Sequence, residues 1–261
     1  MTGDRVDVAF SLAAVSISYG PQLVLDAVSM KIPKGGITSF IGPNGSGKTS
    51  LLRCLNRMND LVANIRVRGR IEYQGEDLNA PDADVEAIRR RIGMVFQRPN
   101  VFPRSVYDNI AYGPRLRGRT TDLDTLVEHC LRQAGLWAEV RSQLSRPAHE
   151  LSGGQQQRLV IARALAVQSE VLLMDEPCAA LDPAASLAIE QLMVELAQER
   201  TVVLVTHDLA QARRVSGHVA FLQAEQVGQE QRHGHLVEFG DADQVFNDPI
   251  DERTRAYLTS R

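Results

Sequence analysis

The run GPNGSGKT, residues 42–49, constrains this chain more than any other segment. It matches the pattern G-x-x-x-x-G-K-S/T and follows an apolar stretch, residues 37–41, that is typical of a buried strand. Apolar residues at helical spacing come after it, so a strand, a glycine-rich turn and a helix are predicted in that order. Glycines let backbone N–H groups turn toward an anion, and the helix start adds partial positive charge. The predicted phosphate-binding residues are Gly42, Pro43, Asn44, Gly45, Ser46, Gly47, Lys48, Thr49 and Ser50.

The rest of the chain alternates between strand-like and helix-like patterns. Short strands with turn residues between them are predicted at 6–10, 15–18, 23–30, 37–41 and 68–73. Residues from about 98 to about 160 have helical periodicity, and the strands EVLLMDE and TVVLVTH follow with a helix between them. We predict an α/β fold over residues 1–261, a single cassette with a P-loop NTPase core. The core and an antiparallel β subdomain would take residues 1–97 and 161–261, and the inserted helical subdomain about 98–160.

Two predicted strands end on residues that suit nucleotide chemistry. VLLMDEP places Asp175 and Glu176 at the carboxyl end of a buried strand, and VLVTH places His207 after the next one. Parallel α/β sheets bind ligands at this edge. We predict that Lys48 bridges the β- and γ-phosphates, and that Thr49 and Asp175 hold Mg²⁺. Glu176 would orient or deprotonate the attacking water, and His207 would reach the γ-phosphate.

The segment LSGGQQQRL, residues 151–159, reads as a helix start. Ser152 is a good N-cap residue, and the apolar residues from Leu159 to Leu165 fall on one helical face. Four N–H groups are unpaired at a helix start, and the two glycines allow an anion to come close to them. We predict a second phosphate-binding device, whose nucleotide belongs either to this chain or to another one.

Composition narrows the class of protein. A chain of 261 residues that is 44% apolar can bury a sizeable core. The net charge of −3, without long runs of one sign, argues against a nucleic-acid binder that depends on general phosphate attraction. Three cysteines far apart argue against a disulfide framework, and the N-terminus lacks the layout of a secretory signal. A cytosolic, reducing location is expected.

Taken together, the motifs carry a resemblance. In this order and spacing, GPNGSGKT, VFQRP, LSGGQ, VLLMDEP, AALD and VTH resemble the nucleotide-binding subunit of an ABC transporter over nearly the whole chain. The resemblance implies ATP and Mg²⁺ as ligands and a homodimer packed head to tail, in which LSGGQ of one copy covers the ATP of the other. It also implies a role for each matching residue. Tyr19 would stack on adenine, and Gln97 would sense Mg²⁺ and the membrane partner. The γ-phosphate held by the opposite copy would be capped by Ser152, Gly153, Gly154 and Gln155. Asp182 would lie across the dimer seam, and His207 would hold the γ-phosphate.

A finer resemblance concerns the transported substrate. The runs FPRSVYDNIAYG and EPCAALDP are similar to the ATPase of phosphate-specific importers, which implies two permease subunits, a solute-binding protein and a place at the cytoplasmic face of the inner membrane. The run THDLAQA and the Asn44 of the loop depart from that pattern. Importers of phosphonate, tungstate or polar amino acids stay open, as does an ATPase that acts on DNA or ribosomes.

Cys178 and residues 223–235 can each be interpreted either as ordinary structure or as a functional feature. Cys178, two residues after Glu176, is read as a small core residue, with a redox-sensitive thiol as the alternative. Residues 223–235 read as a polar hairpin extension. Two histidines on a loop are usually solvated, so His233 and His235 are interpreted as solvated rather than metal-binding.

Overall fold

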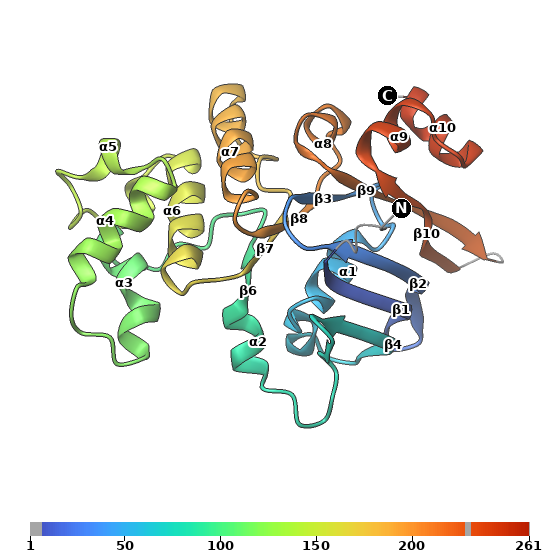
Figure 1. Cartoon of the computed structure of the whole chain (residues 1–261), viewed down its shortest axis with the longest axis horizontal. Coiled ribbons are helices and arrows are strands. Elements are labelled where there is room, and N and C mark those ends of the chain that lie inside the picture. The colour runs from blue at the N-terminus through green and yellow to red at the C-terminus, as the bar shows by residue number, and fades with distance from the viewer. Residues whose placement is uncertain (1–6, 228–230, 261) are drawn as a thin grey trace, which may run out of the picture.

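The computed structural model describes residues 7–227 and 231–260. In this part of the chain ten strands form one sheet in the order β5-β4-β1-β2-β10-β9-β3-β8-β7-β6 (Figure 1). The strands are β1 Val8–Tyr19, β2 Gln22–Pro33, β3 Ile37–Ile41, β4 Ile65–Tyr73, β5 Glu76–Asp77, β6 Ile92–Val95, β7 Val171–Asp175, β8 Thr201–Val205, β9 His218–Val227 and β10 Gln231–Asp241. The helices are α1 Lys48–Cys54, η1 Met58–Leu61, α2 Val85–Arg91, α3 Val106–Leu116, α4 Leu123–Gln133, α5 Trp137–Val140, η2 Ala148–Glu150, α6 Gly153–Ala166, α7 Pro183–Leu196, α8 Leu209–Val215, α9 Ala242–Asn247 and α10 Glu252–Thr259.

One half of the sheet is parallel, and it positions the site. Strands β9, β3, β8, β7 and β6 pair in parallel, and every residue of β3, β7 and β8 is buried. Such continuous apolar strands are expected where helices cover both faces. Leu173 and Val203 pack in the cluster that contains α1, whereas Leu172 and Leu204 pack in the cluster that contains α6 and α7. The carboxyl ends of β3, β7 and β8 therefore meet at one edge, below which α1 begins.

The other half of the sheet is antiparallel, as predicted. Strands β1 and β2 form a hairpin through the turn at Gly20 and Pro21, and β4 pairs with the outer side of β1. The prediction of two strands at 6–10 and 15–18 was wrong, because β1 runs unbroken from Val8; Val6 lies outside the described residues. A bulge explains the difference: Ala14 has φ +48°, and the register with both neighbouring strands shifts there.

A group of helices stands apart from the strands at one end of the molecule (Figure 1). Helices α3, α4 and α6 share one core, to which α4 contributes Val127, Cys130 and Leu131 at the predicted helical spacing. The division of the chain into subdomains stays a prediction. Its boundary near residue 160 falls inside α6, which ends only at Ala166.

The C-terminal part joins the two halves of the sheet, because β9 pairs with β3 and β10 pairs with β2. Strands β9 and β10 form the predicted hairpin, with Gln223 paired to His235, and its residues 228–230 lie outside the described part of the chain. Helix α10 packs back on the hairpin, where the ring of Tyr257 stacks on Phe221 at 4.8 Å between centroids.

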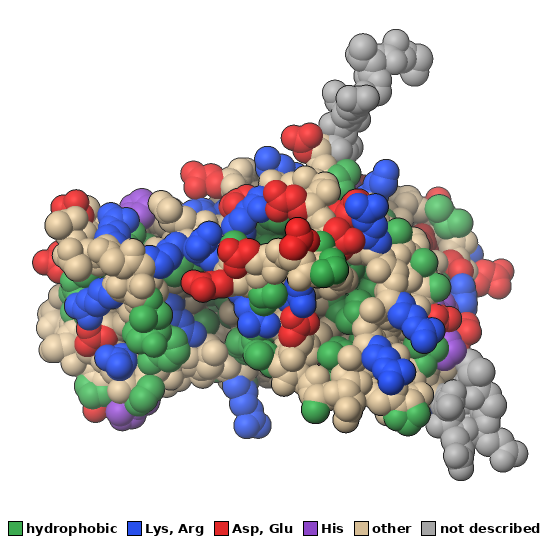
Figure 2. Space-filling view, turned by 90° about the horizontal axis from the view of Figure 1, so that it is seen from below, with side chains coloured by type: hydrophobic (Ala, Val, Ile, Leu, Met, Phe, Trp, Pro, Cys, Tyr) green, Lys and Arg blue, Asp and Glu red, His purple; other side chains and the backbone are tan. Residues whose placement is uncertain are grey.

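The visible surface is mixed in charge. Figure 2 shows acidic and basic side chains interspersed over one face, with hydrophobic side chains scattered between them. Across residues 7–227 and 231–260, no helix has the length and apolar character needed to cross a membrane.

Candidate nucleotide-binding and hydrolysis site

The loop between β3 and α1 is shaped as a cradle. Gly47, at the N-cap of α1, has φ +86°, a conformation that L-residues with a side chain rarely adopt. No side chain caps α1, so its first N–H groups are available to a bound anion. A cavity of 280 Å³ lies over the loop and is lined by Val24, Asn44, Gly45, Gly47, Lys48, Thr49, Ser50 and Glu176.

Lys48 is held over this loop by backbone carbonyl groups. Its ammonium group donates to the oxygens of Gly42 at 2.8 Å and Pro43 at 2.9 Å, and the side chain is buried. A buried ammonium needs such partners. They keep the positive charge inside the cradle, where a phosphate group would meet it.

The β9–β10 hairpin packs closely against the loop. Gly234 of β10 pairs with Leu25 of β2, and a Cβ added at Gly234 would collide with the carbonyl oxygen of Ser46. Ser46 is fully buried. The hairpin interpreted from the sequence as a polar extension therefore touches the predicted phosphate-binding loop.

Thr49 and Asp175 are brought together from α1 and β7. The Thr49 hydroxyl donates to Asp175 Oδ1 at 2.8 Å, and Arg53 Nη2 lies 3.8 Å from Oδ2. Burial raises the pKa of Asp175 above its ordinary value, which the hydrogen bond from Thr49 partly offsets. Hydroxyl and carboxylate oxygens are the hard donors that Mg²⁺ prefers, so the pair fits this ion.

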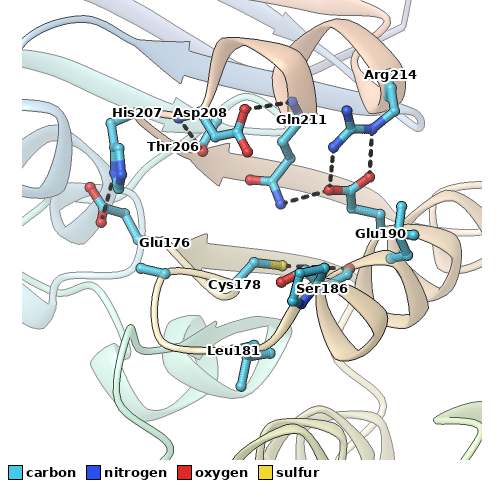
Figure 3. A pocket seen from close by; sticks show the side chains of 13 residues that line it. Glu176, Cys178, Leu181, Ser186, Glu190, Thr206, His207, Asp208, Gln211 and Arg214 are labelled. Atoms are coloured by element: carbon cyan, nitrogen blue, oxygen red, sulfur yellow. Dashed lines mark hydrogen bonds and ion pairs between the residues drawn. The ribbon is translucent and has the colours of Figure 1, made fainter.

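Two of the predicted catalytic residues, Gln97 and His207, converge on a carboxylate oxygen of the third, Glu176. Gln97 Nε2 donates to Glu176 Oε2 at 3.3 Å. His207 Nδ1 lies 3.1 Å from the same oxygen (Figure 3). Glu176 has φ +46°, and its backbone N–H donates to Val205 at 2.9 Å. Left-handed backbone at a bulky residue is rare and typical of functional sites.

Tyr19 lies beside the start of α1. Its hydroxyl group and the Ser50 hydroxyl are 3.1 Å apart, and the ring is partly buried against the core. This position borders the cradle, and stacking on adenine stays a prediction.

The start of α6 is capped by its own side chains. Ser152 Oγ accepts from the Gln155 backbone N–H at 3.3 Å, and Gln155 Oε1 accepts from the Ser152 N–H at 3.0 Å. The Gln155 amide also donates to Glu139 Oε2 at 2.8 Å. Sequence reasoning missed Glu139, because its contact with α6 crosses sixteen residues.

The N-terminal ends of α6 and α7 touch. A Cβ added at Gly154 would come within 2.9 Å of Ala185, so a side chain there would push the two helices apart. Asp182 is exposed and caps α7 by accepting from the Ala185 N–H at 2.9 Å. None of the residues that line the 280 Å³ cradle comes from α6 or α7.

Cys178 lines a second cavity beside Glu176. Burial raises the pKa of its thiol to about 11. The thiolate is the reactive form, so little of it exists at neutral pH, which argues against the redox alternative. The interpretation of His235 as solvated was wrong, because its side chain is only 20% exposed and its Nε2 atom lies 3.4 Å from Glu225 Oε1. No group of three or more His, Cys, Asp or Glu side chains in the described ranges is arranged to hold a metal.

The fold and the loop define a P-loop nucleotide-binding protein. The sequence profile described as ABC transporter matches residues 25–179. The chain belongs to the ABC transporter family, whose ATPases bind ATP.

Relatives extend the match to almost the full chain. It is 52% identical to phosphate import ATP-binding protein PstB 1 of Synechococcus sp. strain JA-2-3B'a(2-13), over 98% of this chain and 94% of that protein. It is 50% identical to PstB 1 of Vibrio parahaemolyticus, over 97% of this chain and 90% of that one. Among solved structures, CbiO1 of Clostridium perfringens, part of the ABC transporter complex CbiONQ, superposes with TM-score 0.77 and 25% identity over 97% of both chains. The predicted fold class is thereby confirmed.

Proposed function

We propose that this chain is the ATP-hydrolysing subunit of an importer for inorganic phosphate. The observation that carries the proposal is the 52% identity, over almost the full length, to a phosphate import ATP-binding protein. The site supports the chemistry, because the cradle, the Thr49–Asp175 pair and Glu176 occupy one edge of the sheet.

Hydrolysis would proceed at this edge. The N–H groups of the loop and Lys48 bind the phosphates of ATP and hold them in place. Mg²⁺, which Thr49 and Asp175 would hold, supplies positive charge beside the phosphates. Glu176 accepts a proton from the attacking water, while Gln97 and His207 keep its carboxylate in place.

The proposed assembly is a homodimer of these cassettes with two membrane permease subunits and a solute-binding protein. It would sit at the cytoplasmic face of the inner membrane. Ser152, Gly153, Gly154 and Gln155 of one copy would then cap the γ-phosphate held by the other. This arrangement is supported by the outward-facing start of α6, whose Ser152 and Gly153 are exposed. Removal of the γ-phosphate would loosen the dimer and so drive the permeases.

The proposal is tested by complementation. In a strain that lacks its phosphate-import ATPase, this chain should restore uptake of radiolabelled phosphate at micromolar concentration, and Glu176→Gln should not. Restoration of phosphonate, tungstate or polar amino acid uptake, with no gain in phosphate uptake, would reassign the substrate. ATPase stimulation by DNA or ribosomes rather than by permease-containing membranes would overturn the transport role.

A further inference from the structure

A second polar cluster lies behind the catalytic carboxylate, outside the cradle. A cavity of 510 Å³ opens beside Glu176 and His207, between the start of α7 and α8 (Figure 3). Its opposite wall is formed by Glu190 of α7 together with Gln211 and Arg214 of α8. The predicted motifs assign no role to these three side chains.

Glu190 is a buried charge with a full set of partners. Its side chain is 7% exposed. The carboxylate accepts from Arg214 Nε at 2.9 Å, from Arg214 Nη2 at 2.9 Å and from Gln211 Nε2 at 3.3 Å. A buried carboxylate is strongly unfavourable without such donors, so these hydrogen bonds hold α8 against α7. Helix α8 has only seven residues, and two of them bind the same carboxylate.

The contact is connected to His207 through the start of α8. Asp208 caps α8 by accepting from the Gln211 N–H at 3.0 Å, and the Asp208 N–H donates to Thr206 Oγ1 at 3.0 Å. His207 lies between these two anchored residues, with its Nδ1 atom 3.1 Å from Glu176 Oε2. On its other side Glu176 is followed by the loop 177–182 and then by α7, which carries Glu190. The chain and the polar contacts together thus connect Glu176, α7 and α8 in a ring.

We propose that Glu190 is a positioning residue for ATP hydrolysis: by binding Gln211 and Arg214 it fixes α8 on α7 and so holds His207 against Glu176. The proposal rests on the proposed ATPase function. In this role Glu190 acts through His207, so its loss lowers the rate of hydrolysis and leaves ATP affinity unchanged.

The first test separates kcat from binding. On the full chain, Glu190→Gln should lower kcat on the order of tenfold through misplacement of His207, with the Kd for ATP unchanged. Arg214→Lys keeps the charge but loses the paired geometry, and it should lower kcat in the same sense. Glu128→Gln is the matched control, since it removes the exposed ion pair with Arg132 on α4 and should leave kcat unchanged. Melting temperatures identify any variant that fails to fold.

A double-mutant cycle with His207→Ala then tests the route. If Glu190 acts through His207, the double variant has the kcat of His207→Ala alone. The inference would be overturned if the reductions in kcat of Glu190→Gln and His207→Ala multiplied in the double variant. It would also be overturned if both Glu190→Gln and Arg214→Lys had a normal kcat. A normal kcat in His207→Ala itself would instead contradict the role of His207 in the proposed function, so the two failures are distinguishable.

Discussion

The starts of α1 and α6 are both glycine-rich helix N-termini, but they are capped in different ways. At α1 the N-cap is Gly47, no side chain occupies the N–H groups, and Lys48 is buried over them. At α6 the side chains of Ser152 and Gln155 cap the helix reciprocally, and Glu139 holds the Gln155 amide. The first is therefore a preformed anion site, whereas the second faces outward with its polar side chains already paired.

In the proposed dimer, the same physical device would serve two purposes. A site that must hold ATP in a single subunit needs open donors and a fixed charge from the same chain. A surface that meets phosphate only when two subunits join can stay capped until then, because exchange of one hydrogen bond for another costs about 1 kcal/mol or less. Variants at the two helix starts should consequently affect different steps.

Lys48→Ala should have the largest effect. Loss of the ammonium group removes charge-assisted hydrogen bonds to phosphate, and we expect ATP affinity of the isolated subunit to fall roughly a hundredfold. Isothermal titration calorimetry with ATP and Mg²⁺ measures it. Lys34→Ala, at an exposed lysine after β2, is the control and should bind normally.

Gly234→Ala should have the next largest effect. The added methyl group would collide with the carbonyl oxygen of Ser46, so either the loop or β10 must move. We expect roughly tenfold weaker ATP binding, since misplaced donors lose part of their interaction with phosphate. Gly240→Ala on the same strand meets the flexible end of Gln244 closely and Val245 at 3.4 Å, but no backbone atom, and it should bind ATP like the parent chain.

Ser152→Ala should spare ATP binding and weaken association. Loss of an N-cap costs about 1 kcal/mol of stability, which lowers the melting temperature by a few degrees. The isolated subunit should bind ATP with unchanged affinity, and ATP-dependent dimerisation should weaken about fivefold by analytical ultracentrifugation. A weakened ATP affinity in the monomer would place α6 at its own cradle.

Glu139→Gln should have the smallest effect. The substitution keeps the shape of the side chain but removes the charge that holds Gln155 and Arg158. Because these contacts are partly exposed, we expect a change in dimerisation of less than about threefold. A tenfold change in either direction would mean that Glu139 controls the start of α6 rather than supports it.

How far the sequence predicts the molecule depends on the range of each contact. The cradle, the Asp175–Glu176 pair and the capped start of α6 are local patterns, in which one short run contains both the strand or helix and its chemistry. The close approach of Gly234 to the Ser46 carbonyl group and the hydrogen bond from Arg214 to Glu190 each join segments that meet only in the folded chain. No spacing rule reveals them.

The unbroken strand β1 also depends on contacts with segments that are distant in the sequence. Ala14 carries no turn chemistry in the sequence, yet a bulge there lets one strand pair with both β2 and β4 where two strands were predicted. Pairing with neighbours overrides local preference in strands more readily than in helices. The helix of α4 followed its predicted spacing for this reason.

In the proposed dimer, the start of α6 from a second copy completes the binding site for the phosphate that one chain's loop holds. The most direct test is the mass of Glu176→Gln in solution with ATP and Mg²⁺, measured by light scattering after size exclusion. We predict a dimer that reverts to the 28.8 kDa monomer without ATP, and a monomer that still binds ATP when Ser152→Arg is added. An ATP-dependent dimer that persists with Ser152→Arg would contradict this role of the start of α6.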